Sequence, residues 1–127
     1  MTKNNYILII DDSSVNRAFI DSVIRKTGYP TMHATDGLDA LDKCVNIRDT
    51  GDSIALCIVD INMPRLDGLE FIRQFRKMNQ PAPIVVLTGE DDETAIQGNK
   101  LLDASVLMCK PFSISELLFQ VNNLLGL

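Results

Sequence analysis

Histidine and cysteine, the residues that most often bind zinc, are scarce in this chain. His33 is the only histidine, and the three cysteines, Cys44, Cys57 and Cys109, include no Cys-x-x-Cys pair. A structural zinc site gathers four such ligands, so a single histidine without a cysteine pair argues against one. An odd number of cysteines favours free, buried thiols over a disulfide framework. We expect His33 to be a partly exposed residue of a strand.

Three sequence motifs of nucleotide-binding and hydrolytic enzymes are also missing. The segment from Gly89 to Lys100 lacks the spacing of a Walker A loop. No G-x-G-x-x-G follows the first apolar run, and no G-x-S-x-G occurs in the chain. The sequence therefore argues against a dinucleotide site and against the nucleophile elbow of the α/β-hydrolases.

The chain has fewer positively charged than negatively charged side chains, and it has no long apolar run. The net charge of −5 argues against a nucleic-acid surface, which needs clustered Lys and Arg, and against binding to anionic lipid. No apolar run reaches the roughly 18–20 residues of a membrane span, and the first residues lack the apolar core of a signal peptide. We therefore expect a cytoplasmic protein with no nucleic-acid or membrane partner.

Short apolar runs are what the chain has instead. The longest begins at Ile54 and continues without a polar break until Asp60. A run of this kind is typical of a strand that is buried on both faces of a sheet. Similar runs or short stretches of β-forming residues elsewhere complete a set of five predicted strands, at residues 6–10, 31–34, 54–60, 84–88 and 105–109.

Helical signals separate these strands. Apolar residues recur at helical spacing, and N-cap candidates stand at Ser13 or Ser14, at Asp67 and at Ser113. The predicted helix after Asp91 is weak, because Gly98 lies in its middle and costs up to about 1 kcal/mol relative to Ala. The side chains expected to face the core are Val15, Phe19, Ile20, Val23 and Ile24 in the first helix, Leu38, Leu41 and Val45 in the second, Leu69, Phe71, Ile72 and Phe75 in the third, and Leu118, Val121 and Leu125 in the last.

The order of these elements predicts the fold class. Five strands alternate with five helices, which implies βαβ units, a parallel sheet and right-handed crossovers. A length of 127 residues suits a single domain, and no repeat or linker interrupts the pattern. We therefore predict one α/β domain over residues 1–127.

Four of the five predicted strands end in a functional group. The groups are the acid pair Asp11 and Asp12, then Asp60, Thr88 and Lys110. One acid after a strand is usually a helix cap or a solvated loop residue. The carboxyl ends of parallel strands meet at one edge, however, and that edge is where open α/β sheets bind ligands. The set therefore predicts a functional site.

The chemistry of these groups points to phosphoryl transfer. Carboxylates that lie close together repel, which costs stability, and a divalent cation removes that cost. Oxygen ligands without Cys or His nearby favour Mg²⁺. Asp60 would then attack phosphorus and form an aspartyl phosphate, while Lys110 and Thr88 bind the phosphoryl oxygens.

These residues resemble a known family, the receiver domain of two-component response regulators. The resemblance extends from Tyr6 to about Leu125 and is strongest to the single-domain chemotaxis regulators. The matching segments are Asp11-Asp12, Asp60 with Asn62-Met-Pro and Asp67-Gly68, Thr88-Gly89, and Lys110-Pro111-Phe112. The resemblance implies a flavodoxin-like (CheY-like) doubly wound sheet with strand order 2-1-3-4-5 and five flanking helices.

The resemblance also implies the partners and the metal site. A histidine kinase or phosphotransfer protein would donate its phosphohistidine phosphoryl group to Asp60. The Mg²⁺ ligands would be Asp12, Asp60 and the Asn62 carbonyl, with Asp11 acting through water. Thr88 and Lys110 would contact the phosphoryl group and relay its arrival to an effector protein at the face of helix four, strand five and helix five. The same family often has a cis peptide at Lys110-Pro111.

Two positions depart from the family pattern. Leu107 stands three residues before Lys110, where many receivers carry Tyr or Phe, and Asp103 replaces the usual Gly. Leu gains nothing from exposure to water, so we expect Leu107 to stay inward. The departure concerns signalling more than the chemistry of the site.

Two other functions compete with a phosphorylation-controlled binding module. The first is a Mg²⁺-dependent phosphohydrolase or phosphotransferase that uses Asp60 on an external substrate. Asn62 argues against it, because such an enzyme needs an acid there to protonate the leaving group. The second is a pseudo-receiver that binds partners without phosphate, and the intact acid set argues against that. We expect self-phosphorylation and autodephosphorylation only, and no enzyme in the wider sense.

Overall fold

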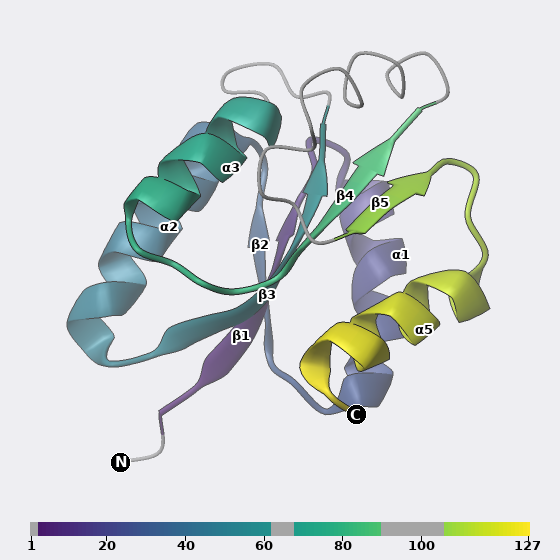
Figure 1. Ribbon diagram of the computed structural model, residues 1–127, viewed down its shortest axis with the longest axis horizontal. Helices are drawn as coiled ribbons and strands as arrows, with labels where there is room; N and C mark the ends of the chain where they lie inside the picture. The colour runs from purple at the N-terminus through teal and green to yellow at the C-terminus, as the bar shows by residue number, and fades with distance from the viewer. Residues whose placement is uncertain (1–2, 62–67, 90–105) are drawn as a thin grey trace.

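Five parallel strands form one sheet in the computed structural model, which describes residues 3–61, 68–89 and 106–127 (Figure 1). Their order across the sheet is β2-β1-β3-β4-β5, and each neighbouring pair is parallel, as predicted. β3 is the central strand, which explains its unbroken apolar run. The strands are β1 (Asn5–Ile10), β2 (Thr31–Ala34), β3 (Ser53–Asp60), β4 (Ile84–Thr88) and β5 (Val106–Cys109).

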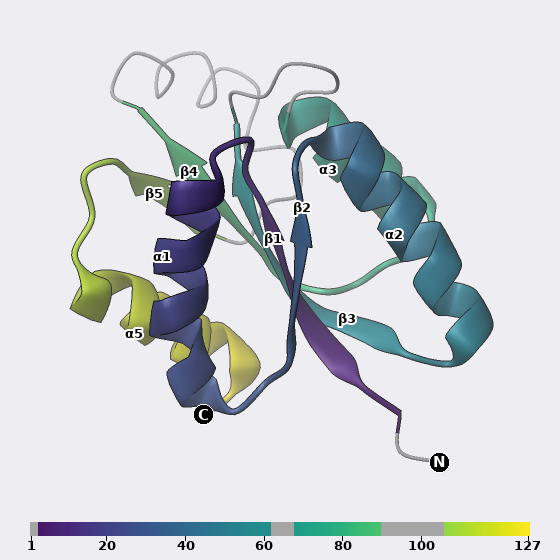
Figure 2. The same cartoon turned by 180° about the vertical axis from the view of Figure 1, so that it is seen from behind.

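Helices cover both faces of this sheet. α1 and α5 lie on one face, and α2 and α3 lie side by side on the other (Figures 1 and 2). The described part of the chain holds four of the five predicted helices, and the one predicted after Asp91 falls outside it, with Gly98 and Asp103. The helices are α1 (Ser14–Ile24), which continues into a 3-10 turn (Arg25–Thr27), α2 (Gly37–Thr50), α3 (Gly68–Lys77) and α5 (Ile114–Leu125).

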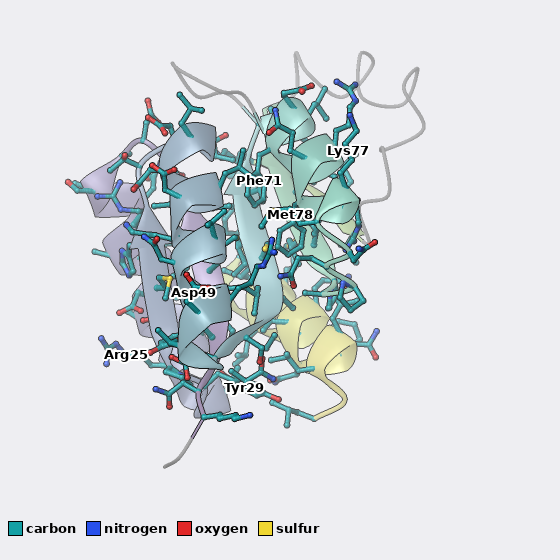
Figure 3. The ribbon with its side chains drawn as sticks, turned by 90° about the vertical axis from the view of Figure 1, so that its left-hand side faces the viewer. Arg25, Tyr29, Asp49, Phe71, Lys77 and Met78 are labelled. Atoms are coloured by element: carbon teal, nitrogen blue, oxygen red, sulfur yellow. The ribbon has the colours of Figure 1, made fainter. Side chains whose placement is uncertain are left out.

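Each face of the sheet carries its own hydrophobic core. Successive side chains of a strand point to opposite faces, so Leu8 joins the core under α2 and α3 while Ile9 joins the core under α1 and α5. Phe71 and Phe75 are fully buried, and their rings stack with centroids 5.4 Å apart. Figure 3 shows Phe71 among the side chains of α3.

The predicted inward face of α3 is confirmed, with Leu69 half-buried. The predicted inward face of α5 is confirmed at Val121, whereas Leu118 and Leu125 are half-buried and the fully buried Leu117 is a further member of that face.

The predicted inward face of α1 is wrong at two of its five positions. Ile20, Val23 and Ile24 are buried, but Val15 is 76% exposed and Phe19 is 42% exposed. The first turns of α1 lie beside the carboxyl ends of the strands, where no described element covers Val15. These two apolar side chains are therefore available at the edge of the sheet that holds the functional groups.

The predicted inward face of α2 is offset by one residue. Leu38 and Val45 are exposed and Leu41 is only half-buried. The helix turns about 100° per residue, so an offset of one residue moves the buried face by that angle. The residues that face the core are instead Gly37, Ala40, Cys44 and Ile47. They are smaller on average than the three predicted residues, which explains why the hydrophobic pattern pointed to the wrong face.

The caps of α1 and α5 are at residues predicted from the sequence, Ser13 and Ser113, and Asp36 caps α2. Ser13, Asp36 and Ser113 each accept a hydrogen bond from a backbone N–H three residues further on, at 3.2, 2.9 and 3.1 Å. Gly28 has φ +84°, the left-handed conformation that ends a helix. Asp67, the predicted cap of α3, lies outside the described residues. The caps fix where α1 begins, and with it the turn that carries Asp11.

Asp21 ties α1 to β2. Its carboxylate is almost buried, accepts a hydrogen bond from Arg25 Nε at 2.7 Å and lies 3.5 Å from His33 Nε2. Burial alone raises the pKa of Asp21, but hydrogen bonding with Thr31, Arg25 and His33 outweighs it and lowers the pKa below its usual value. Asp21 is therefore ionised at neutral pH. His33 is the half-exposed strand residue that the sequence predicts.

None of the three cysteines forms a disulfide bond, as predicted. Cys44 and Cys57 are buried, whereas Cys109 is only half-buried. Burial raises the pKa of Cys44 to about 11 and that of Cys57 well above its usual value, so neither is a nucleophile at neutral pH. Among the helices that the structure describes, none has the length and apolarity to cross a membrane.

Candidate functional site

The strand register brings the predicted functional groups to one edge of the sheet. Ile10 of β1 pairs with Val59 of β3. The residues that follow them, Asp11 and Asp60, therefore lie at the same height along the two strands. β4 continues one residue further, to Thr88, which pairs with Cys109 of β5. Lys110 follows directly. The structure therefore gathers the groups that the sequence places at strand ends, with Asn62 outside the described residues.

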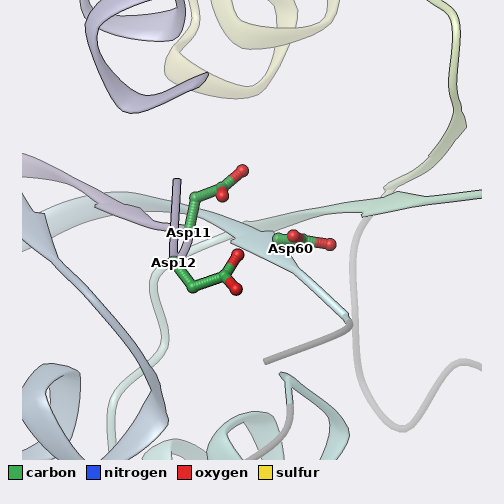
Figure 4. A group of neighbouring side chains, drawn as sticks. All are labelled: Asp11, Asp12 and Asp60. Carbon is green, nitrogen blue, oxygen red and sulfur yellow. The ribbon is translucent and has the colours of Figure 1, made fainter. Parts of the chain in front are cut away.

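Three carboxylates form the centre of this edge. One carboxylate oxygen from each of Asp11, Asp12 and Asp60 lies within 4.8 Å of the other two, and Figure 4 shows the three side chains as neighbours. Asp11 is 1% exposed and Asp60 6% exposed, whereas Asp12 is open to solvent. Buried carboxylates at this separation repel. The cluster is therefore an oxygen-only donor set that suits a hard divalent cation.

Hydrogen bonds hold Asp11 so that one carboxylate oxygen remains available. Its backbone N–H donates to the Ala34 carbonyl at 3.1 Å, and its Oδ1 accepts from the Ser13 N–H at 2.8 Å. Its Oδ2 is buried and has no hydrogen-bond partner among the described residues. A buried carboxylate oxygen is costly to leave unpaired. This oxygen therefore fits a cation site, and the residues present are suited to Mg²⁺.

Lys110 brings a positive charge to the site. Its Nζ lies 3.5 Å from Asp60 Oδ1, and its side chain is partly exposed. Its backbone N–H donates to the Thr88 carbonyl at 2.7 Å, which ties the end of β5 to the end of β4. The Lys110–Pro111 peptide is cis, as predicted. The ammonium group therefore faces the carboxylate at the end of the central strand.

Thr88 ends β4 with a fully buried hydroxyl. This hydroxyl donates to the Gly89 carbonyl at 3.0 Å. Rotation about one side-chain bond would release it to donate elsewhere. Thr88 therefore brings a hydrogen-bond donor to the same edge as Asp60 and Lys110.

Gly68 packs directly against the backbone that follows the central carboxylate. Its N–H donates to the Ile61 carbonyl at 3.1 Å. A Cβ at this position would lie 2.8 Å from the Asp60 carbonyl oxygen and 2.9 Å from Ile61 Cα, which is closer than carbon and oxygen atoms tolerate. Only glycine lets α3 start here. The sequence shows Gly68 as part of a motif but not this close approach.

A cavity of about 220 Å³ opens beside the acids. Its polar lining includes Asp11 and Lys110, together with Asn16. Its apolar lining includes Phe19 and Phe112. Phe19 is one of the residues predicted to face the core. Its place at this cavity puts α1 and the segment after β5 beside Asp11 and Lys110.

Comparison with known proteins decides the family. The family model of the response regulator receiver domain matches residues 7–122. The chain belongs to this family. It is a receiver domain of two-component phosphorelay signalling, and its sheet order and flanking helices are those of the flavodoxin-like, CheY-like fold.

Individual proteins similar to this chain support the same family assignment. Response regulator MprA of Mycobacterium sp. (strain KMS) is 37% identical over 119 residues, which cover 94% of this chain and 50% of that protein. Sporulation initiation phosphotransferase F of Bacillus subtilis is 32% identical over 114 residues, or 90% of this chain and 88% of that protein. The solved structure of chemotaxis protein CheY4 of Vibrio cholerae matches with a TM-score of 0.81 at 30% identity, covering 95% and 98% of the two chains. The receiver thus spans about half the length of the MprA relatives it matches.

Leu107 occupies the position where the family often has an aromatic residue. It is half-buried, pairs with Val86 of β4 and packs against the core under α2 and α3. This placement agrees with the expectation that it lies inward. Its behaviour after phosphorylation stays a prediction.

Proposed function

We propose that this receiver takes a phosphoryl group onto Asp60 from the phosphohistidine of a histidine kinase or phosphotransfer protein, and that the modification switches binding to an effector protein. One observation supports the choice of Asp60 above the others. It ends the central strand, within 4.8 Å of the other two acids and 3.5 Å from the Lys110 ammonium. We further propose that residues 1–127 act as one receiver unit.

The chemistry needs little beyond positioning and charge neutralisation. An oxygen of the Asp60 carboxylate attacks phosphorus, the bond from phosphorus to the donor imidazole nitrogen breaks, and the electron pair stays on that nitrogen. The Lys110 ammonium neutralises charge on the phosphoryl oxygens. The Thr88 hydroxyl donates to another of these oxygens after it leaves the Gly89 carbonyl.

A divalent cation fits the remaining side of this site. Asp12, Asp60 and the Asn62 carbonyl would hold Mg²⁺, with Asp11 acting through water, and the ion would offset the repulsion between the carboxylates and the incoming phosphoryl group. The buried and unpaired Oδ2 of Asp11 supports this assignment. We propose that the receiver catalyses only its own phosphorylation and the hydrolysis of its own aspartyl phosphate.

Small-molecule phosphodonors separate this function from the enzyme alternative. Incubation with acetyl phosphate and Mg²⁺ should give one hydroxylamine-labile phosphoryl group per chain, and removal of Mg²⁺ by EDTA should reduce the yield to background, because the carboxylates then repel the donor. Intact-mass spectrometry measures both. Repeated turnover of phosphomonoesters without a protein-bound phosphoryl group would instead identify a phosphohydrolase.

The exposed apolar residues of α1 suit the docking of a protein donor. Val15 and Phe19 lie one helical turn apart, and Phe19 lines the cavity that Asp11 and Lys110 also line. For a phosphohistidine to reach Asp60, its protein must bind over the edge of the sheet that holds the acids, and Phe19 is exposed at that edge beside Asp11 and Lys110. We propose that an apolar surface of the donor packs on Phe19, whereas acetyl phosphate needs no such contact.

The variant Phe19→Ala should therefore separate the two kinds of donor. Truncation of a central aromatic contact commonly costs 1 kcal/mol or more, so we expect transfer from a phosphorylated kinase to slow by about tenfold. Phosphorylation by acetyl phosphate should keep its wild-type rate. Phe119→Ala is the matched control, because Phe119 is 67% exposed on α5 and does not line this cavity. Equal slowing with both donors would show that Phe19 supports the fold rather than docking.

The effector would bind at a different surface. Ile114 and Phe119 of α5 are exposed, and a groove of about 460 Å³ between α5 and β5 is lined by Leu107, Cys109 and Phe119 among others. The resemblance assigns output to this face together with helix four, which lies outside the described residues. We propose that the effector contacts α5 and β5 here.

A further inference from the structure

One peptide group joins the two acids that follow β1. Its carbonyl oxygen belongs to Asp11, and its N–H belongs to Asp12. Because a peptide group is planar, rotation of this plane re-aims the side chains on both sides. The orientation of the Asp11–Asp12 peptide therefore decides whether the two carboxylates converge with that of Asp60.

Arg17 of α1 holds this peptide group. Its Nη1 donates to the Asp11 carbonyl oxygen at 2.6 Å. Side chains of a helix lean toward its N-terminus, so an arginine in the second turn folds back over the turn that precedes the helix. The Arg17 N–H also donates to the Ser13 carbonyl at 3.0 Å, which anchors the helical turn from which the guanidinium reaches.

Burying the guanidinium of Arg17 costs free energy unless attraction to the nearby carboxylates offsets that cost. Arg17 is half-buried, and its Nε is buried without a hydrogen-bond partner in the part of the chain that the structure describes. Burying a charged group is unfavourable. A positive charge on the Asp11 side of the cluster offsets that cost, because it is attracted to the carboxylates there. Lys110 has the same effect on the Asp60 side.

We propose that Arg17 is a positioning residue of the receiver site. It fixes the Asp11–Asp12 peptide so that Asp11 Oδ2 and the Asp12 carboxylate point toward one cation, and its charge reduces the repulsion between the acids before the cation binds. The proposal rests on the proposed function for the identity of the cation. The orientation of the peptide itself does not depend on that function.

The variants Arg17→Gln and Arg17→Lys test this role by NMR, since the chain has no tryptophan to report binding. Loss of a group that orients a metal ligand commonly weakens metal affinity by about 10–100-fold, and we expect a loss in this range for Arg17→Gln. Arg17→Lys keeps the charge and one donor, so it should recover part of the affinity. Without Mg²⁺, the amide resonances of Asp12 and Ser13 should already shift in Arg17→Gln.

Arg25→Gln is the matched control. It removes an arginine–carboxylate contact from the end of the same helix, where Arg25 Nε donates to Asp21 at 2.7 Å, without touching the acidic turn. It should lower the free energy of unfolding and leave Mg²⁺ affinity unchanged. Wild-type affinity and unshifted Asp12 and Ser13 amides in Arg17→Gln would overturn the proposal. If the wild type bound no Mg²⁺, the proposed function would fail while the amide shifts still tested the role of Arg17.

Discussion

The Asp60→Asn variant should take up no hydroxylamine-labile phosphate, from acetyl phosphate or from a phosphorylated kinase. An amide is not a nucleophile toward phosphorus, and Asp60 is the carboxylate that faces the Lys110 ammonium, at 3.5 Å. The fold should survive, because Asn has nearly the shape of Asp and removes one charge from a cluster of three acids. We therefore expect a complete loss of phosphorylation without a loss of stability, measured by intact mass and by denaturant unfolding.

Asp49→Asn provides the control for the charge change. Asp49 is an exposed residue of α2, so its replacement alters net charge without altering the site. This variant should be phosphorylated like the wild type. An Asp60→Asn protein that still carried one hydroxylamine-labile phosphoryl group would mean that another carboxylate accepts it.

The Gly68→Ala variant should lose both stability and phosphorylation. The added methyl group would lie 2.8 Å from the Asp60 carbonyl oxygen and 2.9 Å from Ile61 Cα. Because these are backbone atoms, either α3 or the end of β3 must move. Overpacking of this kind costs typically about 1–3 kcal/mol. The displaced backbone carries Asp60, so we also expect phosphorylation by acetyl phosphate to slow severalfold.

Gly126→Ala separates these two effects. Gly126 has φ +75° with open space around its Cα, so the substitution costs roughly 1–2 kcal/mol through the left-handed backbone alone. The two variants should therefore unfold with similar ease, while only Gly68→Ala changes the rate of phosphorylation. If Gly68→Ala matched the wild type in both stability and rate, α3 would not depend on the contact seen here.

The strands, the inward face of α3 and part of the inward face of α5 were predictable, because burial leaves a direct mark on their sequences. A central parallel strand such as β3 must be apolar on both faces, and α3 presents Phe71 and Phe75 at helical spacing. The inward faces of α1 and α2 were harder to predict. Val15 and Phe19 are apolar but lie at the edge of the sheet, and α2 buries small residues such as Ala40 instead of its larger ones.

The residues of the site also fall into a group that the sequence predicts and a group that it does not. Asp60, Thr88 and Lys110 could be predicted because each stands at the end of a strand, and parallel strands end together. Arg17 and Gly68 could not, because their roles depend on a hydrogen bond and a close approach between elements that only the folded chain brings together. An arginine one turn into the helix that follows an acid pair is the signal that would have found the first of them.

Mapping the phosphoryl group to a residue tests the central claim most directly. The wild-type receiver is phosphorylated with acetyl phosphate in Mg²⁺, the aspartyl phosphate is trapped by chemical reduction, and the modified peptide is sequenced by mass spectrometry. The account predicts one modification per chain, at Asp60, and none when EDTA replaces Mg²⁺. Modification at Asp11, Asp12 or any other residue, or uptake that is independent of Mg²⁺, would contradict it.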